Sequence, residues 1–205
     1  MWWLIKAKIK NVLVKDQISN FRPRKDEVLI DCGANIGGVA ARLWRPGVEI
    51  HAFEPNPAAY AVLSRRFKGF ADVRCINAAL LDHEGSVELY LDRRASSDLV
   101  GFSQGSSLMA SKSNVDSKQG VSVRAIDIVK HIREQKKPIG LLKMDVEGVE
   151  YILLEALLNA GLLQKIRYVL VEAHEAKMPE IRESAERVRR RIAELGLTNI
   201  DLTWH

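Results

Sequence analysis

An aspartate, two glycines and an asparagine stand close together near the start of the chain, in the segment Asp31-Cys32-Gly33-Ala34-Asn35-Ile36-Gly37. The segment follows a short apolar run and precedes an apolar pattern of helical spacing, so we expect it to join a strand to a helix. Glycines at such a turn let a ligand approach the backbone closely. The spacing therefore predicts a ligand-binding turn that includes Asp31, Gly33, Asn35 and Gly37.

This turn differs from the glycine pattern that binds the pyrophosphate of nicotinamide cofactors. In that pattern a glycine stands where this chain has Asn35, and a carboxylate such as Asp31 would repel a pyrophosphate. The carboxylate suits a cationic ammonium or sulfonium group, as in S-adenosylmethionine. Glu54 ends the next apolar run, where an acidic side chain can accept hydrogen bonds from both hydroxyls of a ribose. Together these residues predict a site for S-adenosylmethionine.

A second set of polar residues follows two later apolar runs. Asp145 and Glu147 come after the first run, and Glu172 and His174 end the second. Doubly wound sheets place reactive groups at such strand ends, so we expect Asp145 or Glu147 to hold the acceptor or the methionyl end, with His174 or a carboxylate as general base. Helix capping by the acids is the alternative. The four side chains could also gather one divalent cation, but spacing alone assigns no metal ligand.

The elements that must position these residues alternate between strand-like runs and helical patterns, which indicates βαβ units and a parallel sheet. Between residues 93 and 120 the pattern gives way to serines and glycines, which predicts a long loop and a candidate substrate cover. The expected strands are 28–31, 49–53, 73–76, 87–91, 121–123, 139–144 and 168–173, and the expected helices are 36–44, 57–67, 126–135, 149–158 and 181–195.

Three segments together resemble the FkbM family of class I methyltransferases: residues 29–37, Phe53-Glu54-Pro55-Asn56-Pro57 and Lys143-Met144-Asp145-Val146-Glu147-Gly148-Val149-Glu150. The resemblance covers roughly residues 27–174. It implies a Rossmann-like, doubly wound and mostly parallel α/β sheet, S-adenosylmethionine as methyl donor, and O-methylation of a hydroxyl on a sugar or secondary metabolite. It also implies cofactor contacts at Pro55, Asn56 and Asp145, and an adenine-side loop at Asn77-Ala78-Ala79.

The sequence departs from this family at its end, where residues 197–203 leave room for one strand after the last helical pattern. The family normally closes its sheet with an antiparallel pair of strands at this point. The resemblance therefore predicts a class I methyltransferase fold that lacks the last strand.

Length and charge indicate one domain with a basic arm. The chain has 205 residues, of which 47% are hydrophobic, and a net charge of +5, which suits a single core. Residues 1–25 alone carry about +6. We expect a basic arm or helix at 1–25 and the methyltransferase domain at 26–205. The arm could contact an anionic membrane surface. Its basic residues are Lys6, Lys8, Lys10, Lys15, Arg22, Arg24 and Lys25.

Other patterns bear on location and partners. We find no membrane-spanning run or signal peptide, and Cys32 and Cys75 fit no disulfide or metal pattern, so we expect a soluble cytoplasmic protein. A small-molecule or glycan acceptor is expected. An NAD-type Rossmann oxidoreductase is one alternative, and a domain that binds the cofactor without transferring methyl is another. A nucleic-acid methyltransferase is suggested by the pI of about 9.2, but the sequence lacks that class's Asn-Pro-Pro-Tyr and Pro-Cys motifs.

Overall fold

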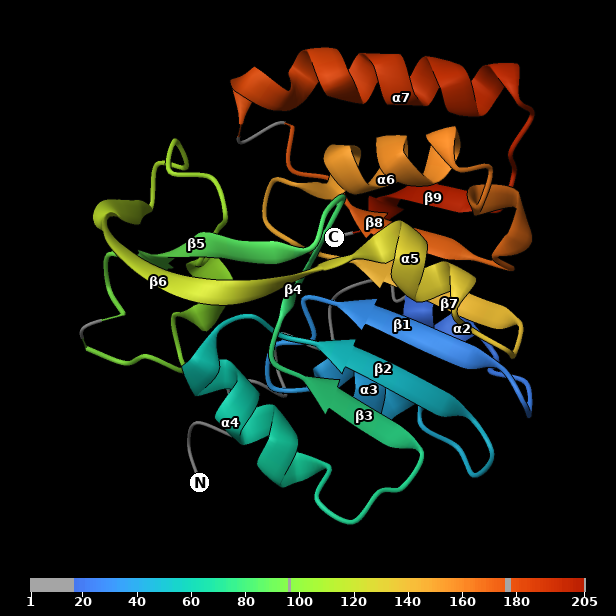
Figure 1. Cartoon of the computed structure of the whole chain (residues 1–205), viewed down its shortest axis with the longest axis horizontal. Coiled ribbons are helices and arrows are strands. Elements are labelled where there is room, and N and C mark those ends of the chain that lie inside the picture. Colours follow the sequence, from blue (N-terminus) through green and yellow to red (C-terminus); the bar gives the residue numbers. More distant parts are fainter. Residues whose placement is uncertain (1–16, 96, 176–177, 205) are drawn as a thin grey trace.

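The computed structural model describes residues 17–95, 97–175 and 178–204. Its centre is a six-stranded sheet of order β3-β2-β1-β7-β8-β9, in which all neighbouring strands are parallel (Figure 1). Strand order reverses between β1 and β7, which confirms the predicted doubly wound α/β fold. The strands are β1 (Val28–Cys32), β2 (Glu49–Phe53), β3 (Val73–Ile76), β7 (Ile139–Met144), β8 (Val169–Glu172) and β9 (Ile200–Trp204).

Helices cover both faces of this sheet, and β1 shows why. All its residues are buried. Val28 and Ile30 pack in the apolar cluster with α5, α6 and α7, whereas Leu29 packs in the cluster with α2, α3 and α4. A strand buried on both faces needs a continuous apolar run. The helices are α2 (Gln17–Asn20), α3 (Gly38–Leu43), α4 (Pro57–Arg66), α5 (Ile128–Arg133), α6 (Glu150–Asn159) and α7 (Arg182–Glu194).

A second sheet of order β4-β6-β5 lies beyond the carboxyl ends of β1 to β3 (Figure 1). It consists of β4 (Ala79–Leu81), β5 (Gly85–Asp92) and β6 (Val115–Asp127). The extra strand predicted at 87–91 is confirmed as β5, whereas β4 was not predicted. The predicted loop 93–120 is wrong at its end, because residues 115–120 are part of β6. At the two ends of this stretch Val115 pairs with Asp92 and Gly120 pairs with Tyr90 of β5, across an irregularity in the register.

The described residues of the segment 93–114, which are all but residue 96, lie outside strands and include one short 3-10 helix, η1 (Ser103–Gly105). The buried carboxylate of Asp92 ties the two ends of this segment together. It accepts hydrogen bonds from Asn114 at 2.7 Å and from the Arg94 guanidinium at 2.9 Å. The Arg94 hydrogen bonds hold the pKa of Asp92 well below its usual range. The segment thus has a defined path over the carboxyl edge of the sheet.

The two ends of the described chain pack on the main sheet. Ile18 and Phe21 are buried, so residues 17–25 lie against the domain, whereas residues 1–16 of the expected basic arm lie outside the described residues. Among the residues described, β9 is the one strand after α7, and it is parallel to β8.

Within the described part of the chain, no helix is long and apolar enough to cross a membrane. Cys32 is a buried free thiol and Cys75 a partly buried one.

Candidate active site

A cavity lies at the carboxyl edge of the main sheet, between the turns that follow β1, β2, β7 and β8 and the segment 93–114. Most residues predicted to bind the cofactor line this cavity, namely Gly33, Asn35, Glu54, Pro55, Asn56, Ala78 and Asp145. Glu172 also lines it. The remaining three, Asp31, Gly37 and Asn77, are not part of the lining. The cavity therefore joins the two sets of polar residues that the sequence singles out.

Glu54 is buried at the end of β2, on the floor of the cavity. Its carboxylate accepts hydrogen bonds from the backbone N–H groups of Asn35 at 2.7 Å and Asn56 at 2.8 Å. Burial raises the pKa of Glu54 to about 7, against the lowering effect of these two N–H groups. Each carboxylate oxygen keeps a further lone pair, so Glu54 can accept two more hydrogen bonds from a ligand.

The turn after β1 lies directly against the segment after β7, and Gly33 makes this possible. Its φ is +76°, in the left-handed region, and a Cβ there would lie 1.8 Å from the carbonyl oxygen of Asp145. Glycine alone adopts this φ without strain and has no Cβ that would clash with the carbonyl oxygen. The N–H of Asp145 also donates to the carbonyl of Cys32 at 3.1 Å. The two halves of the site are therefore in backbone contact.

Asn35 occupies the position where a nicotinamide-binding turn has a glycine. Its φ is +49°, a conformation that asparagine adopts more readily than most residues. Its side-chain oxygen accepts from the N–H of Ile36 at 2.6 Å, and its Nδ2 donates to Ser103 Oγ at 3.2 Å. Asn35 therefore connects Glu54, which its backbone N–H binds, to the segment that covers the cavity.

Asp31 pairs with a buried lysine. The Nζ of Lys143 lies 3.0 Å from the Asp31 carboxylate and donates to the carbonyls of Gly33 at 2.7 Å and Cys32 at 3.2 Å. Burial by itself lowers the pKa of Lys143, but the Asp31 and Asp145 carboxylates raise it above its ordinary value. Lys143 is therefore charged and neutralises the Asp31 carboxylate, which the sequence analysis had matched to a cationic ligand.

Two other predicted residues support the backbone around the cavity. A Cβ on Gly37 would lie 2.6 Å from the Phe67 ring, so Gly37 faces the helix α4. Asn77 donates to the carbonyls of Glu54 at 2.8 Å and Pro55 at 3.1 Å. Both residues hold the turns that carry the lining residues.

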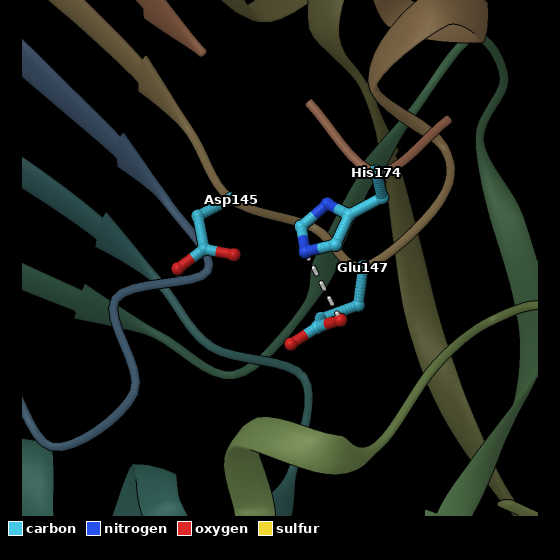
Figure 2. Close-up of side chains that lie close together, drawn as sticks. All are labelled: Asp145, Glu147 and His174. Atoms are coloured by element: carbon cyan, nitrogen blue, oxygen red, sulfur yellow. Dashed lines mark ion pairs between the residues drawn. The ribbon is translucent and has the colours of Figure 1, made fainter. Parts of the chain in front are cut away.

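The three predicted catalytic residues converge on one point (Figure 2). Asp145 and Glu147 follow β7, His174 follows β8, and one ligand atom from each lies within 4.8 Å of the others. Nε2 of His174 is 3.3 Å from Oε2 of Glu147. Asp145 also lines the main cavity, so this cluster lies next to it.

Glu150 orients the imidazole of His174. Oε1 of Glu150 is 2.8 Å from Nδ1 of His174 and also accepts from the N–H groups of Val146 at 3.2 Å and Gly148 at 3.1 Å. Burial by itself lowers the pKa of His174. The carboxylates of Glu150, Glu147 and Asp145 raise it by more than burial lowers it, and the pKa is raised to about 9. In this arrangement the imidazole carries a proton at neutral pH.

Glu147 has a strained backbone that its neighbours compensate. Its φ is +57°, which costs a residue other than glycine about 1–3 kcal/mol. Lys112 donates to the Glu147 carboxylate at 2.6 Å, and Ser107 Oγ donates to the Glu147 carbonyl at 2.6 Å. Burial raises the pKa of Glu147, while Lys112 lowers it. Strain at a defined position often accompanies a functional side chain.

The segment 93–114 contacts both ends of the cavity, in keeping with a substrate cover. Ser106 Oγ accepts from Asn56 Nδ2 at 3.3 Å on one side, and Ser107 and Lys112 hold Glu147 on the other. Ser103, Gln104 and Leu108 also line the cavity. The size and polarity of the space for an acceptor therefore depend on this segment.

Sequence reasoning missed Lys143 and Lys112. Lys143 carried a signal, because it is the one charged residue in the buried run 139–144, and a buried lysine needs an acidic partner. The neighbouring strand offers Asp31, which pairs with Lys143 in the sheet register. Lys112 stands in a serine-rich stretch without any such pattern, and only the folded path of the segment brings it to Glu147.

The family model described as the methyltransferase FkbM domain matches residues 31–197. Among solved structures, precorrin-6y C5,15-methyltransferase from Geobacter metallireducens GS-15 is similar at 12% sequence identity and a TM-score of 0.42, over 85% of this chain and 67% of that chain. None of the curated proteins compared with the chain matches it.

Proposed function

Because the chain belongs to the FkbM methyltransferase family, we propose that it transfers the methyl group of S-adenosylmethionine to a hydroxyl oxygen of a sugar or secondary metabolite. The observation that carries this proposal is that one cavity is lined both by Gly33, Asn35 and Glu54, from the turns after β1 and β2, and by Asp145 and Glu172, from the carboxyl ends of β7 and β8. A nucleoside-binding end and an acidic acceptor end share one space.

The residues of the first end fit an adenosine. The Glu54 carboxylate is held by two backbone N–H groups and retains acceptor capacity for the two ribose hydroxyls. Gly33 leaves the turn free of a side chain beside the cavity. Lys143 neutralises Asp31, so we assign the cationic end of the cofactor to two other carboxylates that line the cavity, Asp145 and Glu172.

At the second end the chain orients an acceptor and receives its proton. When bound, S-adenosylmethionine would supply an electrophilic methyl group on its sulfonium: the acceptor oxygen would bond in line to the methyl carbon as the C–S bond breaks and S-adenosylhomocysteine leaves. Asp145 and Glu172 can accept a hydrogen bond from the acceptor hydroxyl, which places its oxygen. As the O–C bond forms, the acceptor's proton would pass to the carboxylate of Asp145 or Glu147, because the imidazole of His174 already holds a proton. Positioning of the acceptor contributes most of the rate.

Cofactor binding is tested first, without knowledge of the acceptor. We expect S-adenosylhomocysteine to raise the melting temperature in a concentration-dependent way and NAD to leave it unchanged. Glu54→Gln should weaken the response, whereas Glu183→Gln, which removes an exposed charge on α7, should not. Stabilisation by NAD alone would favour the oxidoreductase alternative and contradict the proposal.

Acceptor class is tested with radiolabelled methyl donor. We expect label in hydroxyl-bearing glycosides or secondary metabolites, in a product that resists mild base because methyl ethers, unlike methyl esters, do not hydrolyse. Oligonucleotides serve as the comparison. Labelling of nucleic acid, with none in any hydroxyl compound, would contradict O-methylation of small molecules.

A further inference from the structure

We propose that Asp145, Glu147 and His174 bind one divalent transition-metal ion beside the cavity. One carboxylate oxygen from each acid and one ring nitrogen of His174 lie within 4.8 Å of one another. Two ligands of a single ion with bonds of about 2.2 Å are at most about 4.4 Å apart. Small side-chain rotations therefore bring all three groups onto one ion, and Figure 2 shows them pointing toward a common centre.

The ring of His174 points to a ligand independently of the acids. Its side chain is 1% exposed, and Nε2 has no hydrogen-bond partner, although Glu147 Oε2 lies 3.3 Å away. Glu172 Oε1 lies 3.7 Å from the same nitrogen, so the protonated ring has ion contacts at Nε2 but no hydrogen bond there. A metal ion on Nε2 would replace this proton. Nδ1 lies 2.8 Å from Oε1 of Glu150. A carboxylate on the far nitrogen is the usual support for a metal-binding histidine, because it orients the ring and increases its basicity.

The backbone conformation of Glu147 aims its carboxylate into the cluster, and a lysine occupies one of the carboxylate oxygens. The left-handed conformation at Glu147 turns its carboxylate toward Asp145 and His174 and is held there by Ser107. The ammonium of Lys112 lies 2.6 Å from Oε2 of Glu147, so a positive charge already sits at the edge of the cluster. Lys112 and a metal ion compete for this oxygen, so replacing Lys112 should change the affinity of the site for the metal.

The ligand set selects the type of metal. Two carboxylates and one imidazole suit Mn²⁺, Fe²⁺ or Zn²⁺ better than Mg²⁺, which prefers oxygen ligands and retained water. Three protein ligands leave coordination positions open on the cavity side, where Asp145 lines the wall. The metal's role rests on the proposed function: an ion there would bind the acceptor oxygen and make its hydroxyl more acidic.

Metal binding is measured on the full chain after removal of metals with EDTA, by titration with Mn²⁺ followed by electron paramagnetic resonance and with Zn²⁺ by calorimetry. We expect one site. Asp145→Asn and His174→Gln should each weaken binding at least about tenfold, the loss of one strong ligand interaction. Lys112→Met should strengthen it, because the competing ammonium is gone. Glu183→Gln and His83→Gln, exposed side chains outside the cluster, should bind like the unaltered chain.

The outcomes separate this site from a structural ion network. Absence of saturable binding by the unaltered chain, or equal affinity after His174→Gln, would overturn the proposal. Lys112→Met decides even where other variants fold poorly, because in a purely structural network its loss brings no gain in metal affinity. Binding of S-adenosylhomocysteine is measured in parallel. Cofactor binding without any saturable metal binding would refute this inference alone, whereas metal binding without cofactor binding would refute the proposed function alone.

Discussion

At the β1–β2 end of the cavity the backbone holds one carboxylate, whereas at the β7–β8 end charged side chains hold one another. Glu54 receives N–H groups from turns that are close in sequence. Glu147, by contrast, is held by Lys112 and His174, which come from distant segments. The first arrangement needs short, well-defined turns, and the second needs the whole fold. Backbone N–H donors survive every substitution except one to proline, so single changes should act differently at the two ends.

The largest expected effect concerns the ion pair beneath both ends. Lys143→Met leaves the buried carboxylate of Asp31 without its partner, which we expect to lower the free energy of unfolding by about 3–5 kcal/mol. Urea denaturation measures this change. Adding Asp31→Asn removes the stranded charge, so the double variant should recover part of the loss. If Lys143→Met alone were as stable as the unaltered chain, Asp31 would not depend on Lys143.

The next effect tests the backbone contact between the two ends. Gly33→Ala introduces both a strained φ and a Cβ 1.8 Å from the Asp145 carbonyl oxygen, so we expect a loss of about 2–3 kcal/mol in urea denaturation. Gly69→Ala is the matched control, because its φ is +91° and its Cβ would meet nothing within 4 Å. A loss of equal size in both variants would mean that strain alone, and not contact between the halves, makes glycine necessary.

A smaller effect concerns the charge of Glu54. Its pKa is raised to about 7 in the folded chain, so the folded state holds a proton that the unfolded state releases near pH 4.5. This contribution to stability is present below pH 4.5 and is lost as the pH rises through 7. Affinity for S-adenosylhomocysteine should change in the opposite sense and increase over the same range, because the ionised carboxylate is the better acceptor.

Glu54→Gln should remove both pH dependences and weaken cofactor binding about tenfold or more, as expected for loss of a charged hydrogen-bond acceptor. Calorimetry from pH 5.5 to 8 measures the affinity, and urea denaturation over the same range measures the stability. An unchanged pH profile in this variant would show that another group controls binding.

The smallest effect separates stability from binding within the β1–β2 end. Asn56 caps α4 by accepting from the N–H groups of Ala58 and Ala59, and Asp127 caps α5 in the same way. Each change to alanine should cost about 1 kcal/mol in unfolding free energy. Asn56→Ala should also weaken S-adenosylhomocysteine, because Asn56 lines the cavity, whereas Asp127→Ala should leave affinity unchanged. Equal affinities would place Asn56 outside the binding surface.

The sequence by itself determined the alternation of strands and helices and the doubly wound sheet. Its local patterns were sufficient because buried parallel strands are continuous apolar runs, and β2, β3 and β7 have the predicted bounds. The residues of the β1–β2 end could be named for the same reason, since a strand, a glycine turn and a helix are contiguous in the chain.

Only the tertiary structure decided which charges meet. The pairing of Asp31 with Lys143, the approach of Lys112 to Glu147 and the convergence of Asp145 and His174 all join segments far apart in sequence. The strand at 115–120 was likewise decided by its pairing with β5 and not by its own polar residues. Such contacts depend on sheet register and on the path of a long connection, neither of which leaves a local pattern in the sequence.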